Sequence, residues 1–413
     1  MPLLVRCDEL QPGMRLAEAI IHRGRTMLSG GKVLTSADAE ILGRKMPELT
    51  VRVVDPVLDN VIEFEDDSRE REVSRKVATK VAGAMEQVGE RFSARASLTG
   101  VNFKALAASV GEITEYLKSN PVSAALLARC LDTESYLADH AGNVFYLSMV
   151  LGAAVRDYVV AERERQSTSR VLQRRLTMNL TPLGLGAMLI DLGMLPLRQL
   201  FKVNRMLTPE ESAQIREHPL AGAATLPEDL SPVAKMVVRT HHENCDGTGY
   251  PTGLSRNKLH VFARIVRVAD AFDAATAVQV YKEAKSPARA LWEMSRGPYR
   301  RFYDPVLIKV FCRLIQPFPI GARLRLVDGR YAVVVRYNRQ EPFLPTVVIA
   351  QDAGGNRLPP DRLEGPLSLA ERRDLRIRAF GGENLAYIFD DCTPQEEACP
   401  HKELHTLFDA AFP

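Results

Sequence analysis

A helical pattern of apolar positions covers the middle of the chain, from about residue 97 to residue 316. Apolar side chains recur every three or four positions, most densely in residues 124–131, 144–160 and 183–192. This spacing puts them on one face of a helix, where they can pack against other helices. The pattern therefore predicts a large all-helical domain over residues 97–316.

The N-terminal sixty residues have a different pattern. Two apolar runs, the second at residues 26–34, flank turn residues. Thr35 and Asp38 then have the spacing of a capping box at the start of a short helix, and residues 49–54 have the composition of a returning strand. We expect residues 1–60 to form a small α+β domain.

A charged segment separates these two regions. Residues 61–96 are rich in charged side chains, and Val73, Val77, Val81 and Met85 recur at four-residue intervals. Positions four apart lie on one face of a helix. The segment is therefore predicted to be a helical connector.

The period of the pattern changes again after residue 316. Residues 322–327 and 331–337 alternate between apolar and polar around Asp328-Gly329, a dipeptide that favours a tight hairpin turn. Residues 317–413 should therefore form a small β subdomain with a C-terminal tail. The predicted fold class is mainly α, with a small N-terminal α+β unit and a small C-terminal β unit.

Size, charge and cysteine usage narrow the class of protein. A chain of 413 residues is long enough for several compact units. The net charge of +3 is near neutral, and no Lys/Arg cluster is interleaved with aromatic residues, so no nucleic-acid partner is expected. Six scattered cysteines are typical of reduced thiols. The longest apolar stretch, residues 144–155, is too short to cross a bilayer, so we expect a cytoplasmic protein without a membrane span.

The densest candidate for chemistry is the segment from His241 to Leu254. It reads His-His-Glu-Asn-Cys-Asp-Gly-Thr-Gly-Tyr-Pro-Thr-Gly-Leu. Neutral imidazole nitrogens are common ligands of zinc, iron and manganese, and glycines let a backbone turn sharply beside a ligand. A pair of histidines alone is more often a surface feature, so the wider sequence has to decide between the two interpretations.

This segment resembles the signature of the HD-GYP family, His-His-Glu-x-x-Asp-Gly-x-Gly-Tyr-Pro-x-Gly-Leu, at every fixed position. The resemblance covers roughly residues 97–316 and includes the regions around His140, Asp191, His218 and Asp270. It implies an HD-type helical bundle with a site for two or three metal ions. Members of the family cleave the phosphodiester bonds of cyclic di-GMP with a metal-activated water, which two cations make available near neutral pH.

The resemblance also implies which side chains bind metal. In this chain the matching positions form two ligand sets that share Asp191. One set is His140, Asp191 and Asp270, and the other is Asp191, His218, His241 and His242. Asp191 would bridge the two metals and position the attacking water.

Two positions depart from the family pattern at the metal site. The His-Asp pair for which the family is named reads Ile190-Asp191, and the lysine usually found three residues later is Met194. Isoleucine offers no lone pair, so the first metal loses a ligand. A further change, Gln279 in place of a phosphate-binding arginine, leaves Lys282 as a cation nearby.

These departures favour one bound ion over two. The second ligand set is intact and suits a single iron, manganese or zinc ion. The alternative is a site without metal, in which the histidines hydrogen-bond to Asp191 and Asp270.

Two functions remain open from the sequence. The first is a degenerate HD-GYP protein of cyclic di-GMP signalling, with weak or no phosphodiesterase activity, that acts as a nucleotide- or protein-binding module. Tyr250, Pro251 and Lys282 would contact the nucleotide or a partner, such as a diguanylate cyclase docked on the Gly249-Tyr250-Pro251 loop. The alternative is an active metal-dependent phosphodiesterase that hydrolyses cyclic di-GMP to linear pGpG or GMP.

Overall fold

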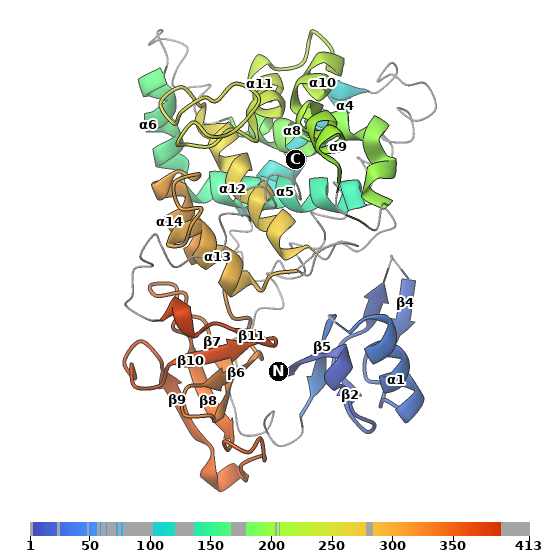
Figure 1. Ribbon diagram of the computed structural model, residues 1–413, viewed down its shortest axis with the longest axis vertical. Coiled ribbons are helices and arrows are strands. Elements are labelled where there is room, and N and C mark those ends of the chain that lie inside the picture. Colours follow the sequence, from blue (N-terminus) through green and yellow to red (C-terminus); the bar gives the residue numbers. More distant parts are fainter. Residues whose placement is uncertain are drawn as a thin grey trace.

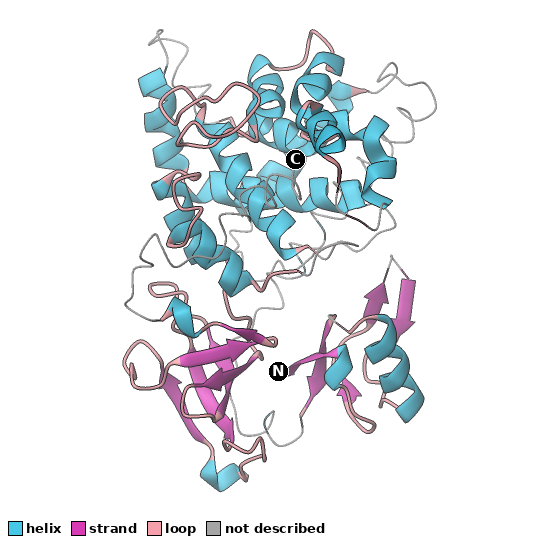
Figure 2. Ribbon diagram, viewed as in Figure 1, coloured by secondary structure: helices cyan, strands magenta, loops and turns pink. Residues whose placement is uncertain are grey.

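The computed structural model separates helices from strands, with helices at one end of the molecule and two β units at the other (Figure 2). The described residues are 3–22, 25–47, 49–55, 102–119, 136–166, 179–202, 207–277 and 284–389, with isolated residues 58, 63, 72, 76 and 205 between them. The predicted fold class is confirmed: a mainly α bundle accompanied by a small α+β unit and a small β unit.

The helical domain is built around one apolar helix. Its described elements are α4 (Phe103–Ser119), α5 (Tyr136–Ala154), α6 (Arg156–Gln166), α8 (Thr181–Leu189), the 3-10 helix η2 (Leu192–Lys202), α9 (Pro209–Arg216), α10 (His218–Thr225), α11 (Pro232–Thr240), α12 (Val261–Thr276), α13 (Pro287–Ser295) and α14 (Pro305–Leu314). Every residue of α5 from 140 to 152 is buried, and α5 packs against α8 and α12 (Figure 1). Its apolar composition is therefore that of a core helix.

The described part of the chain contains apolar helices. No single helix there is both long and apolar enough to cross a bilayer. Residues 139–154 and 156–165 meet the criterion only as a pair, and they are bent against each other by 84°.

The N-terminal unit combines short strands with one helix. Its elements are β1 (Leu3–Arg6), η1 (Cys7–Glu9), β2 (Arg15–Leu16), β3 (Ile20–His22), β4 (Arg25–Leu28), α1 (Ser36–Lys45) and β5 (Thr50–Val54). The strands form an antiparallel sheet in the order β1-β5-β2 and a separate β3-β4 pair. Thr35 and Asp38 form the predicted capping box at the start of α1.

The C-terminal unit is a six-stranded antiparallel sheet in the order β11-β10-β6-β7-β8-β9. Its elements are β6 (Arg323–Leu326), β7 (Tyr331–Arg336), β8 (Thr346–Gln351), η3 (Pro360–Arg362), β9 (Glu364–Ser368), β10 (Ile377–Phe380), β11 (Glu383–Asn384) and η4 (Ala386–Ile388). The predicted hairpin is confirmed, because β6 and β7 pair across Asp328-Gly329 and Gly329 has a φ of +91°.

The two β units contact each other directly. The Leu4 amide donates to the Gly321 carbonyl at 3.0 Å, and Arg323 forms an ion pair with Glu9 at 2.8 Å. The predicted connector over residues 61–96 lies outside the described residues except at three isolated positions. The domain boundaries drawn from the sequence remain predictions.

Candidate metal centre

Five segments of the helical domain bring seven polar side chains into one buried cluster. The cluster consists of His140 from α5, Asp191 from the turn after α8, His218 from α10, His241 and His242 from the end of α11, and Asp270 and Asp273 from α12. None of these seven side chains is more than 12% exposed. All six side chains predicted as metal ligands are therefore brought together.

Two helix signals place His218. Thr208 and Glu211 form a capping box at the start of α9, as their spacing predicts, with Pro209 in its first turn. The helix ends at Arg216. A new helix, α10, begins at His218, and a proline in its first turn needs no N–H partner there.

Close backbone packing holds Asp191 beside His218. A Cβ atom on Gly193 would lie 2.1 Å from the His218 carbonyl oxygen and 2.8 Å from the Gly222 nitrogen. These are backbone atoms that cannot rotate away, so any larger residue would push η2 off α10. Gly193 therefore sets the distance between the turn that carries Asp191 and the helix that carries His218.

We call His218, His241 and His242 the three-histidine half of the site. One ligating atom from each ring lies within 4.8 Å of those of the other two. The Nδ1–H groups of His218 and His241 donate to the carbonyls of Ile215 and Val238, each at 2.8 Å. These backbone bonds fix both ring orientations and both tautomers.

The fixed tautomers leave two lone pairs facing each other. With the protons on Nδ1, the Nε2 atoms of His218 and His241 are both acceptors, and they are only 3.1 Å apart. A hydrogen bond between them would need one ring to be cationic. Burial opposes this charge and lowers the pKa of His218 and of His241 to about 4. Burial lowers the pKa of His242 as well, followed by the nearby charge of His241.

We call His140, Asp270 and Asp273 the His140 half of the site. The Nδ1 atom of His140 lies 2.7 Å from an oxygen of Asp273, and its Nε2 atom lies 3.1 Å from an oxygen of Asp270. Ionised carboxylates only accept hydrogen bonds, so this geometry suits a ring that donates from both nitrogens. Burial alone would raise the pKa of Asp270, but the hydrogen bond from His140 and the surrounding positive charge hold it below its ordinary value. The polar groups of this half therefore satisfy one another.

Asp191 lies between the two halves. One of its oxygens is 3.5 Å from Nε2 of His140, and the other is 3.6 Å from Nε2 of His218. Burial raises the pKa of Asp191. A carboxylate with one oxygen toward each half has the geometry of a bridge.

The two departures from the family pattern are both buried. Ile190 is 0% exposed and directly follows α8 as its C-cap, and Met194 is 4% exposed within η2. Ile190 belongs to the main hydrophobic core and Met194 is a buried apolar side chain, so neither adds a polar atom to the site. Two places that would carry a nitrogen in the family carry apolar atoms here.

The glycine-rich loop is held by the carboxylate of Glu243. One oxygen accepts from the backbone N–H and the hydroxyl of Thr252 at 2.7 and 2.6 Å, and the other accepts from the Leu254 N–H at 2.9 Å. Gly247 and Gly253 have φ values of +84° and +67°, which favour glycine. Much of the motif therefore builds the loop.

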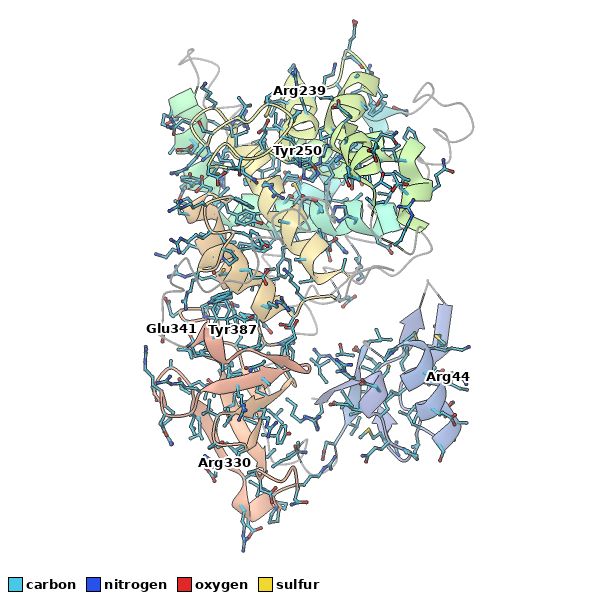
Figure 3. All side chains as sticks on the ribbon, in the orientation of Figure 1. Arg44, Arg239, Tyr250, Arg330, Glu341 and Tyr387 are labelled. Carbon is cyan, nitrogen blue, oxygen red and sulfur yellow. The ribbon has the colours of Figure 1, made fainter. Side chains whose placement is uncertain are left out.

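Tyr250 packs into the site. Its ring is stacked on His242 with centroids 4.7 Å apart, and the guanidinium of Arg216 lies 4.4 Å from its centroid. Only 8% of Tyr250 is exposed, and Figure 3 places it inside the helical domain, whereas Arg239 lies at the outer edge. Pro251 beside it is half-buried. Gln279 and Lys282, predicted near the phosphate, lie outside the described residues.

Two residues of the site were missed from the sequence. Asp273 binds His140, and Arg267 lies 3.6 Å from an oxygen of Asp270. Both stand three positions from Asp270 on α12, so they share its face of the helix. The three-residue spacing from Asp270 is the sequence feature that could have identified both residues.

The donor set of the three-histidine half fits a divalent metal ion. Three imidazoles and the carboxylate of Asp191 are ligands that zinc, iron and manganese accept. The Nε2 atoms of His218 and His241 are 3.1 Å apart, close enough for one cation to contact both. The His140 half lacks this feature.

Comparisons with known proteins identify the helical domain. Residues 159–307 match the family model described as HD domain. A cyclic di-GMP phosphodiesterase of Pseudomonas aeruginosa is 32% identical over 170 residues, which are 40% of each chain. A cyclic di-GMP phosphodiesterase of Thermotoga maritima is 34% identical over 139 residues, 32% of this chain and 37% of the relative.

The matches cover parts of the proteins concerned. This chain spans two fifths or less of the length of these relatives. A solved structure of an HDG"Y"P protein from Bdellovibrio bacteriovorus aligns with a TM-score of 0.40 at 14% identity, over 75% of this chain and 97% of that one. Residues 159–307 are thus similar to the HD domain, and the curated relatives agree with the resemblance of the His241–Leu254 segment to the HD-GYP signature.

Proposed function

We propose that the helical domain binds one divalent metal ion in the three-histidine half, and that the metal-loaded site binds cyclic di-GMP with weak or no hydrolysis. The observation that carries the proposal is the pair of Nε2 lone pairs on His218 and His241, 3.1 Å apart and without a proton to share. The nucleotide is inferred from the relatives, which are named cyclic di-GMP phosphodiesterases.

The residues of the chain have distinct roles in this proposal. His218, His241 and His242 would hold the ion together with Asp191. When bound, the ion would supply Lewis acidity toward a phosphate oxygen. The carbonyls of Ile215 and Val238 keep the two Nε2 atoms free of protons, and Tyr250 supports the ring of His242 by stacking.

Slow turnover follows from the two apolar replacements. Hydrolysis in the family uses two neighbouring cations, and Ile190 removes a ligand of the first. Met194 removes a positive charge near the phosphate. A loss of several kcal/mol of transition-state stabilisation corresponds to a rate reduction of roughly a thousandfold.

The exposed part of the loop is the surface proposed for a protein partner. Tyr250 itself is buried, so a diguanylate cyclase or another signalling protein would meet the loop through Thr252 and Gly253, which are exposed. Because cyclic di-GMP is an intracellular messenger, we also propose a cytoplasmic location.

The alternative function is an active phosphodiesterase. The observation in its favour is that Nε2 of His140 lies 3.5 Å from an oxygen of Asp191 and 3.1 Å from an oxygen of Asp270. Another ligand would then have to replace the missing histidine.

The test is cyclic di-GMP binding and hydrolysis by protein loaded with manganese or ferrous iron. We expect binding to the wild type, binding at least tenfold weaker in His241→Ala, and no measurable pGpG or GMP. Arg239→Gln is the matched control, since this exposed residue lies on α11 two positions before His241. Multiple turnovers by the wild type would favour the alternative, and a wild type that does not bind the nucleotide would refute the proposal.

A further inference from the structure

Arg267 lies next to the metal-site carboxylates. It stands three residues before Asp270 on α12, and its terminal nitrogen is 3.6 Å from an oxygen of that carboxylate. Its side chain is only 11% exposed. Among the described residues, no other arginine or lysine comes within 4 Å of Asp191, Asp270 or Asp273.

The guanidinium of Arg267 is held in place from two sides. Its Nε–H donates to the amide oxygen of Asn244 at 3.0 Å, and Asn244 is itself buried and bonded to Thr248 at 3.0 Å. The guanidinium carbon lies 5.7 Å from the centroid of Tyr303, within cation–π range. A fixed arginine loses less conformational entropy on binding a ligand than a mobile one.

Most of the donors of Arg267 remain available. A guanidinium has five N–H groups, and within the described part of the chain only the Nε–H has an acceptor at hydrogen-bond distance. The separation of 3.6 Å from Asp270 is an ion pair without a hydrogen bond. The planar fork of a guanidinium matches two oxygens of a phosphate group.

Arg267 also supplies a positive charge at a site that lacks the lysine of the family pattern. The family pattern places a lysine at the position of Met194, whose side chain is buried and apolar here. A phosphodiester bound beside the proposed metal ion would also lie near the carboxylates of Asp191, Asp270 and Asp273. A second cation on the side of Asp270 would reduce the repulsion between the phosphate and these carboxylates, and Arg267 lies there.

We propose that Arg267 is the phosphate-binding residue of this site and donates to the non-bridging oxygens of a phosphodiester. The inference deepens the proposed function and rests on it, because it names the residue that recognises the phosphate of the nucleotide. Asn244, in the glycine-rich loop, and Tyr303 act as positioning residues for the guanidinium.

The test is calorimetric titration of the manganese-loaded full chain with cyclic di-GMP and, separately, with inorganic phosphate. In Arg267→Gln both probes should bind about 10- to 100-fold more weakly than in the wild type. Arg267→Lys keeps the positive charge but not the planar guanidinium, so its affinity for both probes should lie between those of the wild type and Arg267→Gln. Arg239→Gln, the exposed control on α11, should bind like the wild type.

Manganese content and thermal midpoint distinguish a ligand contact from a structural role. Both should stay within error of the wild type in all three variants. Unchanged affinity in Arg267→Gln, or a loss of manganese that accounts for the weaker binding, would overturn the inference. If the wild type binds phosphate through Arg267 but not cyclic di-GMP, the proposed function fails and the inference stands; a wild type that binds neither probe overturns both.

Discussion

The two halves of the site contain similar residues, but their hydrogen bonding differs. In the His140 half, both ring nitrogens meet carboxylate oxygens, at 2.7 and 3.1 Å. In the three-histidine half, His218 and His241 direct their Nδ1 protons to backbone carbonyls and turn bare Nε2 atoms toward each other at 3.1 Å. The polar groups of the first half satisfy one another, whereas the second half has the donor set of a metal site.

The difference in hydrogen bonding between the two halves agrees with the positions at which the chain departs from the family pattern. Ile190 removes a ligand that would serve the His140 half, and the carboxylates there pair with His140 instead. The ligands of the other half are all retained. On the proposed assignment, one metal position is lost and the other is kept, because the ligands of each position are oriented by separate backbone and side-chain contacts.

The largest expected effect is a difference in metal affinity between variants of the two halves. We expect His241→Ala to weaken manganese or zinc binding by roughly a thousandfold, since it removes a ligand and an oriented tautomer. His140→Ala should change the affinity less than threefold. Metal titration of both variants measures the effect, and equal losses in the two would remove the distinction between the halves.

A smaller effect is expected from restoring the His140 half. Ile190→His combined with Met194→Lys should add a second bound ion and raise cyclic di-GMP hydrolysis by about a hundredfold, because both missing groups return. The measurement is metal content together with product formation. If hydrolysis stays undetectable with two ions bound, these two residues are not what limits the reaction.

Protein treated with a chelator should lose stability as the pH falls. The pKa of His218 and of His241 is about 4 in the folded chain, below the ordinary value of 6.5. Below pH 6.5 the unfolded chain therefore takes up protons that the folded chain refuses, and stability falls until the pH reaches about 4. In denaturant titrations we expect the free energy of unfolding to fall by about 3 kcal/mol between pH 7 and pH 5. The double variant His218→Gln/His241→Gln should not show this fall.

The smallest expected effect concerns the packing that joins the halves. Gly193→Ala would put a Cβ within 2.1 Å of a backbone oxygen. We expect about 2 kcal/mol of destabilisation and weaker metal binding, because η2 must move away from α10. Gly111→Ala on α4 is the matched control, since a Cβ atom added there would have open space for 4 Å around it. Equal stability of the two variants would show that the contact does not position Asp191.

Local signals in the sequence predicted much of the fold. The capping boxes at Thr35 and Thr208 and the hairpin at Asp328-Gly329 depend on residues close in the chain, and all three are present. The six ligands that the HD-GYP resemblance implied lie close together in the structure. Whether they bind metal remains a prediction.

Other features of the site depend on contacts between distant segments. Asp273 matters because α12 lies against α5, and Arg267 is held by Asn244 from the loop. The burial of Tyr250 results from His242 and Arg216, which belong to separate helical segments. Helical periodicity places each side chain on a face of its helix, but it does not say which helix meets that face.

The most direct test of the account is the metal content of protein purified without a histidine tag and saturated with manganese. We predict one ion per chain, lost in His241→Ala and retained in His140→Ala. Two ions per wild-type chain, or one ion that is lost in His140→Ala and retained in His241→Ala, would contradict the claim that only the three-histidine half binds metal.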